Sequence, residues 1–166
     1  MSTIILNKED KNNNTSKIII DKKNNLVKKI IDYNEFSEEL FNREMFWLLK
    51  LQDTNIVPKV LKYNLSELSI TMNYCGEPIT YNNSPKDVYK QLYNIQIILL
   101  KNNCMYNDWK HGNVLVKDNK VYIIDFGWCP TIKEDYTCNN NVFSDLTVKP
   151  GGGNFFKNIF DDQTVL

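Results

Sequence analysis

The most constraining stretch of the sequence is a pair of short apolar runs, NVLV and VYIID, joined by the polar turn KDNK. Such runs on either side of an Asp-Asn pair are typical of a β-hairpin. With the turn at Asp118 and Asn119, Asn113 lies within about one residue of directly opposite Asp125. The hairpin therefore brings a carboxamide and a carboxylate together at its open end, with Asp108 on the loop just ahead.

These oxygen-bearing side chains suit Mg²⁺, which takes one or two protein ligands and leaves its other positions to water and phosphates. Gly127 follows Asp125 by two residues, so the backbone can turn sharply just after the ligand. The chain's one histidine, His111, lies in the same stretch and could act as a base or a metal ligand. With no second His and no Cys beside it, a turn or packing role is favoured.

The rest of the chain alternates strand-like and helix-like patterns. Three runs rich in Ile and Val, TIIL, KIIID and LVKKII, predict three antiparallel strands in the first thirty residues. A short strand in NIVPKVLKYN and another in LSITMNY follow further on. Apolar residues at helical spacing predict helices over 34–52, capped by Asn34, and over 84–102, beginning at SPKD. Residues 128–153 have no sustained periodicity, and NFFKNIFDD could form a short terminal helix.

Glu44 stands in the middle of the apolar stripe of the first predicted helix, which contains Leu40, Trp47, Leu48 and Leu51. A carboxylate on a buried helix face is costly unless it is paired. Glu44 therefore either reaches solvent at the edge of the stripe or pairs with a Lys or Arg on a neighbouring element.

Composition narrows the class of protein. The 166 residues suit one domain, and a net charge of zero does not favour a nucleic-acid partner. The N-terminus makes a poor signal peptide, no apolar run is long enough to span a bilayer, and four irregularly spaced cysteines predict free thiols in a reducing, cytoplasmic setting. Abundant Asn, Lys and Ile with no Ala indicate an AT-rich genome, as in some protists, bacteria or large DNA viruses.

NDWKHGNVLV followed by VYIIDFG resembles the catalytic and magnesium loops of protein kinases, H-R-D-L-x-x-x-N and D-F-G. The resemblance implies that Asp108 is the base that accepts the proton of the substrate hydroxyl. Asn113 and Asp125 would hold the Mg²⁺ ions that bridge the phosphates of ATP. Lys110 stands where protein Ser/Thr kinases carry a lysine that neutralises the γ-phosphate, which favours a protein substrate over a small molecule.

Upstream, LVKKI resembles the V-A-I-K strand of kinases, with Lys28 in the lysine position and Leu26, bulkier than the usual Ala, above the adenine. Glu44 then resembles the helix glutamate that pairs with this lysine, so the resemblance supplies the partner that burial requires. Lys29 would point to the other face of the strand and is the weaker candidate.

SITMNYCGEP resembles the strand and hinge that bind adenine in kinases. The resemblance implies that Met72 lines the back of the pocket and that backbone groups of Asn73, Tyr74 and Cys75 face the base.

The sequence also departs from the kinase pattern. The glycine-rich loop is absent, so Lys11 or Lys17 would have to help hold the phosphates. Tyr106 and Asn107 replace the His-Arg of the catalytic loop, which disfavours activation by loop phosphorylation. Only 39 residues follow Gly127, with no A-P-E motif.

We therefore expect a single α+β, protein-kinase-like domain. Residues 1–75 would form a small antiparallel-sheet N-lobe with one helix, and residues 76–166 a reduced, mainly helical C-lobe that carries the catalytic hairpin. The expected function is an ATP- and Mg²⁺-dependent phosphotransferase that acts on Ser or Thr of a protein partner. Two alternatives stay open: a pseudokinase that binds nucleotides or proteins, and a small-molecule kinase.

Overall fold

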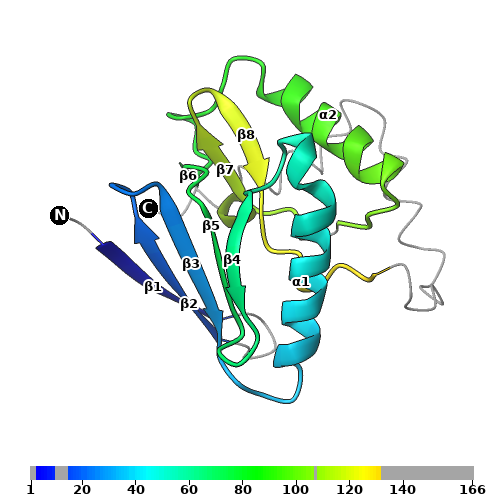
Figure 1. Cartoon of the computed structure of the whole chain (residues 1–166). Helices are drawn as coiled ribbons and strands as arrows, with labels where there is room; N and C mark the ends of the chain where they lie inside the picture. The colour runs from blue at the N-terminus through cyan, green and yellow to red at the C-terminus, as the bar shows by residue number, and fades with distance from the viewer. Residues whose placement is uncertain (1–2, 10–14, 107, 132–166) are drawn as a thin grey trace.

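The computed structural model describes residues 3–9, 15–106 and 108–131, which form two antiparallel sheets and two long helices (Figure 1). The larger sheet has the strand order β1-β2-β3-β5-β4 and the smaller one β6-β7-β8. The strands are β1 (Thr3–Glu9), β2 (Thr15–Asp21), β3 (Leu26–Ile31), β4 (Val60–Asn64), β5 (Ser69–Asn73), β6 (Glu77–Pro78), β7 (Val114–Lys117) and β8 (Lys120–Ile123). The chain thus has the expected α+β fold.

The first three strands confirm the predicted antiparallel order. In the register of β2 and β3, Ile18 lies opposite Lys29 and Ile19 opposite Lys28. Because side chains alternate between the two faces of a strand, the two adjacent lysines of β3 must point in opposite directions. Ile18 lines a cleft on the inner face of the sheet, so Lys29 shares that face and Lys28 lies on the outer one.

Both long helices begin later than predicted. Helix α1 (Ser37–Leu51) starts after a turn in which Asn34 accepts the Phe36 N–H at 2.8 Å, so Asn34 shapes the approach and is not the cap. Helix α2 (Val88–Lys101) starts after a turn closed by the Val88 N–H and the carbonyl of Pro85 at 3.1 Å. In both cases a capping-type sequence forms a turn that leads into the helix.

One hydrophobic core joins the two sheets and both helices. Trp47 of α1, Ile70 of β5, Leu92 of α2 and Ile123 of β8 are all fully buried within it. The Trp47 indole also donates to the backbone carbonyl of Cys129 at 3.2 Å, which fixes the segment after Gly127 against α1. The two sheets are therefore parts of one packed body.

The predicted hairpin is confirmed. Val114 pairs with Ile123, and the Ile124 N–H donates to the Asn113 carbonyl at 3.0 Å, so Asp125 is one residue beyond direct opposition. Asp118 and Asn119 both have positive φ, 50° and 61°, as a type I′ two-residue turn requires. Strand β6, which pairs with β7, was not predicted because two residues that include a proline carry no strand pattern.

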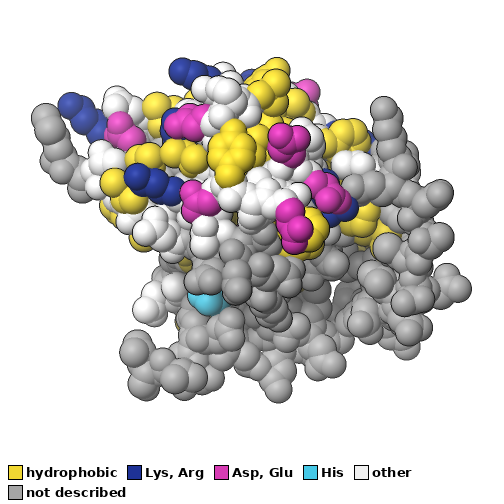
Figure 2. Space-filling model, turned by 90° about the horizontal axis from the view of Figure 1, so that it is seen from below, with side chains coloured by type: hydrophobic (Ala, Val, Ile, Leu, Met, Phe, Trp, Pro, Cys, Tyr) yellow, Lys and Arg dark blue, Asp and Glu magenta, His cyan; other side chains and the backbone are white. Residues whose placement is uncertain are grey.

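Figure 2 shows the end of the molecule at which α1 begins, where acidic, basic and hydrophobic side chains are intermixed over the described surface. Exposed hydrophobic side chains in the segments that lead into α1 and β5 are Tyr33, Phe36 and Leu65. Of the helices in the described ranges, none has the length and apolar character needed to cross a lipid bilayer.

Three of the four cysteines, Cys75, Cys104 and Cys129, are buried free thiols, which confirms the prediction for them. Cys138 lies outside the described residues, as do Lys11, Asn107 and the predicted terminal helix.

Gly76 follows the end of β5 with φ +101°, and a Cβ there would lie 1.9 Å from the carbonyl oxygen of Val116. We expect Gly76→Ala to lower the free energy of unfolding by about 2–4 kcal/mol, because the backbone of β7 would have to move. Gly112→Ala is the control, since a Cβ at that position meets nothing within 4 Å. Urea denaturation measures both, and equal midpoints for the two variants would contradict the expectation.

Candidate functional site

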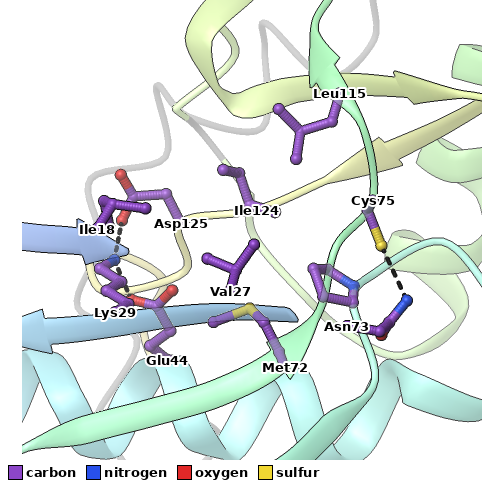
Figure 3. A pocket seen from close by; sticks show the side chains of 11 residues that line it. Ile18, Val27, Lys29, Glu44, Met72, Asn73, Cys75, Leu115, Ile124 and Asp125 are labelled. Carbon is purple, nitrogen blue, oxygen red and sulfur yellow. Dashed lines mark hydrogen bonds and ion pairs between the residues drawn. The ribbon is translucent and has the colours of Figure 1, made fainter. Parts of the chain in front are cut away.

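A cleft of about 500 Å³, part of it open to solvent, lies between the inner face of the larger sheet and the β7–β8 hairpin (Figure 3). Its walls are mostly apolar. Charged side chains gather at one end, and Asn73 and Cys75 lie at the other. The lining residues are Ile18, Val27, Lys29, Glu44, Pro58, Met72, Asn73, Cys75, Leu115, Ile124 and Asp125.

The charged end is built around Lys29. Its Nζ lies 2.9 Å from Oδ1 of Asp125 and also contacts Oε2 of Glu44. The side chains of Lys29 and Glu44 are only 12% and 3% exposed. This ion-paired group, which we call the Lys29 triad, joins β3, α1 and the end of β8. The buried Glu44 therefore has the basic partner that its place on the apolar stripe required.

The expected pairing of Lys28 with Glu44 is wrong. Lys28 lies on the outer face of β3, where its Nζ is 2.7 Å from Oε2 of Glu67. The sequence offers two adjacent lysines, and only the register of β3 in the sheet decides which one faces inward. With Lys29 in place of Lys28 as the inward lysine, the residue expected above the adenine is Val27 and not Leu26. Val27 lines the cleft.

The electrostatics of Lys29 favour its charged form. Burial alone would lower the pKa of Lys29, but the carboxylates of Asp125 and Glu44 outweigh it and raise the pKa above the ordinary 10.5. Because the pKa of Lys29 is raised in the folded state, its ion pairs stabilise the fold fully at pH values below the ordinary lysine pKa. This stabilisation of the fold is lost as the pH rises through the folded-state pKa. Lys29 is therefore fully charged at neutral pH.

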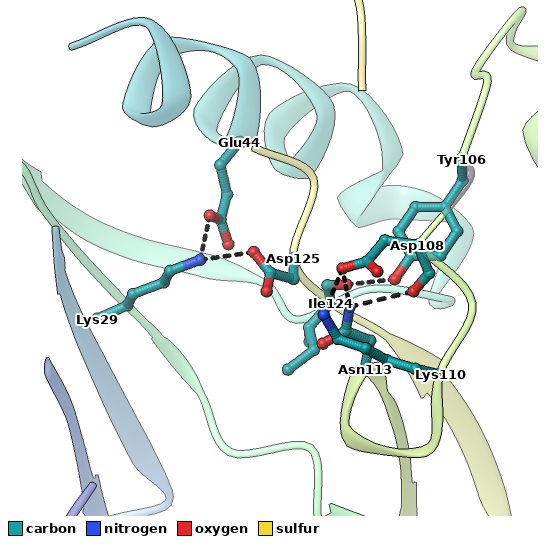
Figure 4. Close-up of polar contacts among 8 residues, drawn as sticks. All are labelled: Lys29, Glu44, Tyr106, Asp108, Lys110, Asn113, Ile124 and Asp125. Atoms are coloured by element: carbon teal, nitrogen blue, oxygen red, sulfur yellow. Dashed lines mark hydrogen bonds and ion pairs between the residues drawn. The ribbon is translucent and has the colours of Figure 1, made fainter. Parts of the chain in front are cut away.

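A second group of polar side chains lies beside the Lys29 triad, on the loop before β7 (Figure 4). Oδ2 of Asp108 accepts hydrogen bonds from Lys110 Nζ at 2.8 Å and from Asn113 Nδ2 at 2.6 Å. Within the described part of the chain, no hydrogen bond involves Oδ1 of Asp108. Oδ2 of this carboxylate is thus held in place by two donors.

Asn113 is fully buried, and its Oδ1 makes no hydrogen bond to any described residue. A buried oxygen without a partner is costly unless something outside the chain satisfies it, such as an ion. No group of three or more His, Cys, Asp or Glu side chains in the described ranges could hold a metal. The amide oxygen of Asn113 and the carboxylate of Asp125 would suit a hard cation whose other positions are completed by phosphate and water oxygens, which is the way proteins bind Mg²⁺.

The chain turns sharply at Asp125 itself. Asp125 has φ 72°, a left-handed conformation that Asp tolerates better than most residues. Gly127 does not have positive φ, but it lies in a turn just after Asp125 in which the Cys129 N–H donates to the Phe126 carbonyl at 2.9 Å. The predicted turn after Asp125 is therefore confirmed. A Cβ at Gly127 would lie 3.4 Å from Cδ2 of Leu40, so the glycine also allows the chain to pass close to α1.

The opposite end of the cleft contains Met72, Asn73 and Cys75, as the sequence predicted. No hydrogen bond to another described residue uses the backbone N–H of Cys75. Burial raises the pKa of the Cys75 thiol to about 11, so this thiol is protonated at neutral pH. Tyr74 does not line the cleft, because Asn25 accepts its N–H and Lys117 donates to its carbonyl.

The RIO domain family matches residues 7–137, which is most of the chain. The chain belongs to the RIO domain family. Two crystal structures of the Rio2 kinase from Chaetomium thermophilum are similar in fold, with TM-scores of 0.62 and 0.66 at 18% and 16% identity. The first is a complex with ADP, Mg²⁺ and phosphoaspartate. These findings confirm the protein-kinase-like fold.

The similarity covers 87% and 96% of this chain but only 52% and 57% of the two Rio2 chains. The RIO domain described here thus spans little more than half the length of either Rio2 chain. No curated protein matches it.

Tyr106 stands at the His position of the catalytic-loop motif. The sequence did not reveal its structural role in this RIO domain. It is buried, and its hydroxyl donates to the Ile124 carbonyl at 2.6 Å, next to Asp125. Its ring packs edge-on against Phe126 and Trp109. Burial, together with the negative charge of Asp125, raises the pKa of Tyr106 well above its ordinary value. Tyr106 is therefore a neutral donor that fixes the backbone ahead of Asp125.

Of the two lysines suggested to hold the phosphates in place of the glycine-rich loop, Lys17 lies in the described part of the chain and does not suit that role. Lys17 is exposed and lies on the face of β2 opposite to Ile18, so it points away from the cleft.

The two neighbouring lysines of β3 provide a matched test of the Lys29 triad. We expect Lys29→Met to lower the free energy of unfolding by about 3–5 kcal/mol, because Glu44 would remain buried without its cation. Lys28→Met should have a much smaller effect, since Lys28 and Glu67 are 34% and 41% exposed.

Urea denaturation of the two variants and of Lys29→Met/Glu44→Met measures these effects. The double variant should recover part of the loss. A Lys28→Met variant as unstable as Lys29→Met would show that the triad is not the buried pair on which the fold depends.

Proposed function

We propose that this RIO domain binds ATP with Mg²⁺ in the cleft and transfers the γ-phosphoryl group to a Ser or Thr hydroxyl of a protein. The observation that carries the proposal is the convergence of the Lys29 triad and the Asp108 group at one end of an apolar cleft (Figure 4). The complex of Rio2 with ADP and Mg²⁺ supports the same choice of ligands.

The apolar part of the cleft suits the adenine ring. Val27 and Met72 from the larger sheet and Leu115 from the hairpin line it (Figure 3). The N–H of Cys75 would donate to a ring nitrogen of the base, which gives a directional contact at the end opposite the charges. The phosphates would then extend toward Lys29 and Asp125.

Asp108 is placed to act on the substrate hydroxyl. Its Oδ1 would accept the hydroxyl proton while the hydroxyl oxygen attacks the γ-phosphorus, and the bond from that phosphorus to the bridging oxygen breaks to release ADP. Lys110, 2.8 Å from Oδ2, would offset the negative charge that gathers between carboxylate and phosphate. Mg²⁺ bound by Asn113 and Asp125 would supply further charge neutralisation.

A second candidate reaction uses the same cleft. In one matched Rio2 structure an aspartate is phosphorylated alongside ADP and Mg²⁺. In this chain Asp125 lines the charged end of the cleft, and Asp108 lies beside it (Figure 4). A carboxylate oxygen of one of them would attack the γ-phosphorus and release ADP, and water would then cleave the acyl phosphate. The net reaction would be ATP hydrolysis.

Two other functions stay as outcomes of the tests below. A pseudokinase would bind nucleotide without turnover and use the fold for binding. A small-molecule kinase would transfer phosphate to a compact alcohol, although Lys110 beside Asp108 favours a protein substrate.

Replacing Asp108 separates chemistry from binding. We expect Asp108→Asn to lower the rate of phosphate transfer from Mg²⁺-ATP to generic protein substrates at least about 100-fold, since the amide cannot accept the proton. Nucleotide binding should persist, measured as a rise in Tm with Mg²⁺-ADP.

The control variant for this test is Asp118→Asn, in the exposed turn of the hairpin. It should leave the transfer rate unchanged. Wild type that binds Mg²⁺-ADP but is as inert as Asp108→Asn would favour the pseudokinase, and transfer only to small alcohols would favour the third function.

The phosphoaspartate route predicts a covalent label. Incubation with γ-labelled ATP and Mg²⁺ should leave protein-bound phosphate that hydroxylamine removes at neutral pH, because an acyl phosphate reacts with it and a phosphoserine does not. Because Asp108 and Asp125 also serve the proposed reaction, mass spectrometry of peptides from the labelled protein, not loss of the label on replacement, identifies the acceptor. A hydroxylamine-stable label would exclude this route and point to Ser or Thr.

A further inference from the structure

Tyr74, between Asn73 and Cys75, is held by contacts from three separate segments of the chain. Its N–H donates to the Asn25 carbonyl at 2.9 Å, and its carbonyl accepts from Lys117 Nζ at 3.0 Å. Its hydroxyl donates to Oε1 of Glu77 at 2.5 Å. Both polar backbone groups and the side chain of this residue are thus engaged.

Lys117 is the member of this arrangement that comes from the catalytic hairpin. Besides the Tyr74 carbonyl, its Nζ contacts Oδ1 of Asn25 and lies 5.5 Å from the centre of the Tyr74 ring. Leu115, two residues earlier on β7, lines the cleft, so Lys117 shares the strand face that is turned toward the cleft. Its ammonium therefore links β7, the β2–β3 turn and the segment after β5.

The residues beside Tyr74 are those that line the uncharged end of the cleft. Asn73 and Cys75 face the cleft, whereas Tyr74 between them does not (Figure 3). With the carbonyl of Tyr74 fixed by a charged donor, rotation of the peptide between Tyr74 and Cys75 would break that hydrogen bond. The hydrogen bond from Lys117 therefore restricts the direction of the Cys75 N–H.

We propose that Lys117 is a positioning residue for the base of the nucleotide, which it serves by holding the Tyr74–Cys75 peptide so that the Cys75 N–H points into the cleft. The inference rests on the proposed binding of a nucleotide there. Lys117 itself touches no part of the ligand in this account.

The need for such a contact follows from the residue after Cys75. Gly76, with φ +101°, has no side chain to restrict the segment, and the segment is the covalent link between the two sheets. A preorganised donor binds more tightly than one that must be ordered on binding. A hydrogen bond from an ammonium to a carbonyl is a strong way to impose that order.

Neither of the other contacts to Tyr74 replaces Lys117. The Asn25 carbonyl accepts the N–H of the Asn73–Tyr74 peptide, which is not the peptide that Lys117 holds. Glu77 contacts Lys22 as well as the Tyr74 hydroxyl, and the Lys22 ammonium, followed by the phenol, lowers the pKa of the Glu77 carboxyl. These contacts hold the Tyr74 ring, whereas Lys117 alone donates to its carbonyl among the described residues. Loss of Lys117 should therefore free the peptide while the ring stays in place.

The test compares Lys117→Met with Lys120→Met by isothermal titration calorimetry in the presence of Mg²⁺. Lys120 is the cross-strand partner of Lys117 and lies 5.0 Å from the centre of the Tyr122 ring, so the control removes the same charge from the same hairpin. The probes are ADP, which contains the base, and inorganic tripolyphosphate, which does not.

We expect Lys117→Met to weaken ADP binding about tenfold, which corresponds to the loss of one charged hydrogen bond, and to leave tripolyphosphate binding unchanged. Lys120→Met should change neither, and Lys117→Arg, which retains a charged donor, should recover part of the ADP affinity. This split between base and phosphate would not arise from a general loss of structure, and circular dichroism confirms that each variant is folded.

Several results would overturn the proposal. Equally weakened binding of ADP and tripolyphosphate would assign Lys117 a general structural role. Unchanged ADP binding would show that the hydrogen bond from Lys117 to the Tyr74 carbonyl has no effect on binding of the base. Wild type that binds neither probe would overturn the proposed function together with this inference. Wild type that binds ADP while Lys117→Met also binds it normally would overturn the inference alone.

Discussion

The fold depends on one buried carboxylate. Glu44 lies on the apolar face of α1 among residues such as Trp47 and Leu48, and an isolated charge there would be strongly unfavourable. Lys29 supplies the opposite charge, and the same ammonium also pairs with Asp125. Because breaking a buried pair leaves an uncompensated ion, the three segments that carry these residues cannot separate independently. The triad thus fixes α1 against the sheet and places the end of β8 at the charged end of the cleft.

The β7–β8 hairpin connects the two ends of the cleft. At its turn, Gln91 of α2 donates to the Asn119 carbonyl at 2.8 Å and accepts the Val121 N–H at 2.9 Å, so the helix holds the turn. At its open end the strands place Asn113 beside Asp125. Near the turn, Lys117 reaches the carbonyl of Tyr74. A hairpin of four residues a side therefore contacts both the charged and the uncharged end of the cleft.

The sequence predicted those parts of the structure that depend on local patterns. The Asp-Asn turn specified the register of the hairpin and therefore the meeting of Asn113 with Asp125. The position of Glu44 on an apolar stripe indicated that it needs a cation, because burial can be inferred from helical spacing alone. The protein-kinase-like fold also followed from motifs whose order and spacing agree, although each is short.

The sequence could not predict features that depend on contacts between different strands and helices. Two adjacent lysines give the same local pattern, and only the pairing of β3 with its neighbours turns Lys29 inward and Lys28 outward. The role of Lys117 could not be predicted, because its two hydrogen-bond partners lie 43 and 92 residues away. The positive φ of Asp125 could not be predicted either, because no local sequence pattern indicates it. For the three lysines, tertiary contacts decide what the local pattern leaves open.

The polar groups that the chain leaves unsatisfied are the strongest reason to regard the cleft as a binding site. Oδ1 of Asn113 is buried without a hydrogen bond, and the N–H of Cys75 and Oδ1 of Asp108 have no partner among the described residues. Elsewhere the chain uses even distant side chains to satisfy backbone groups, as Lys50 does for the Asn102 carbonyl. Since a buried polar group without a partner lowers stability, the buried Oδ1 of Asn113 is the strongest of these indications that the cleft suits a ligand. An acceptor at one end of the cleft and a cation with anionic oxygens at the other would satisfy these groups, which supports the proposed binding of a nucleotide with Mg²⁺.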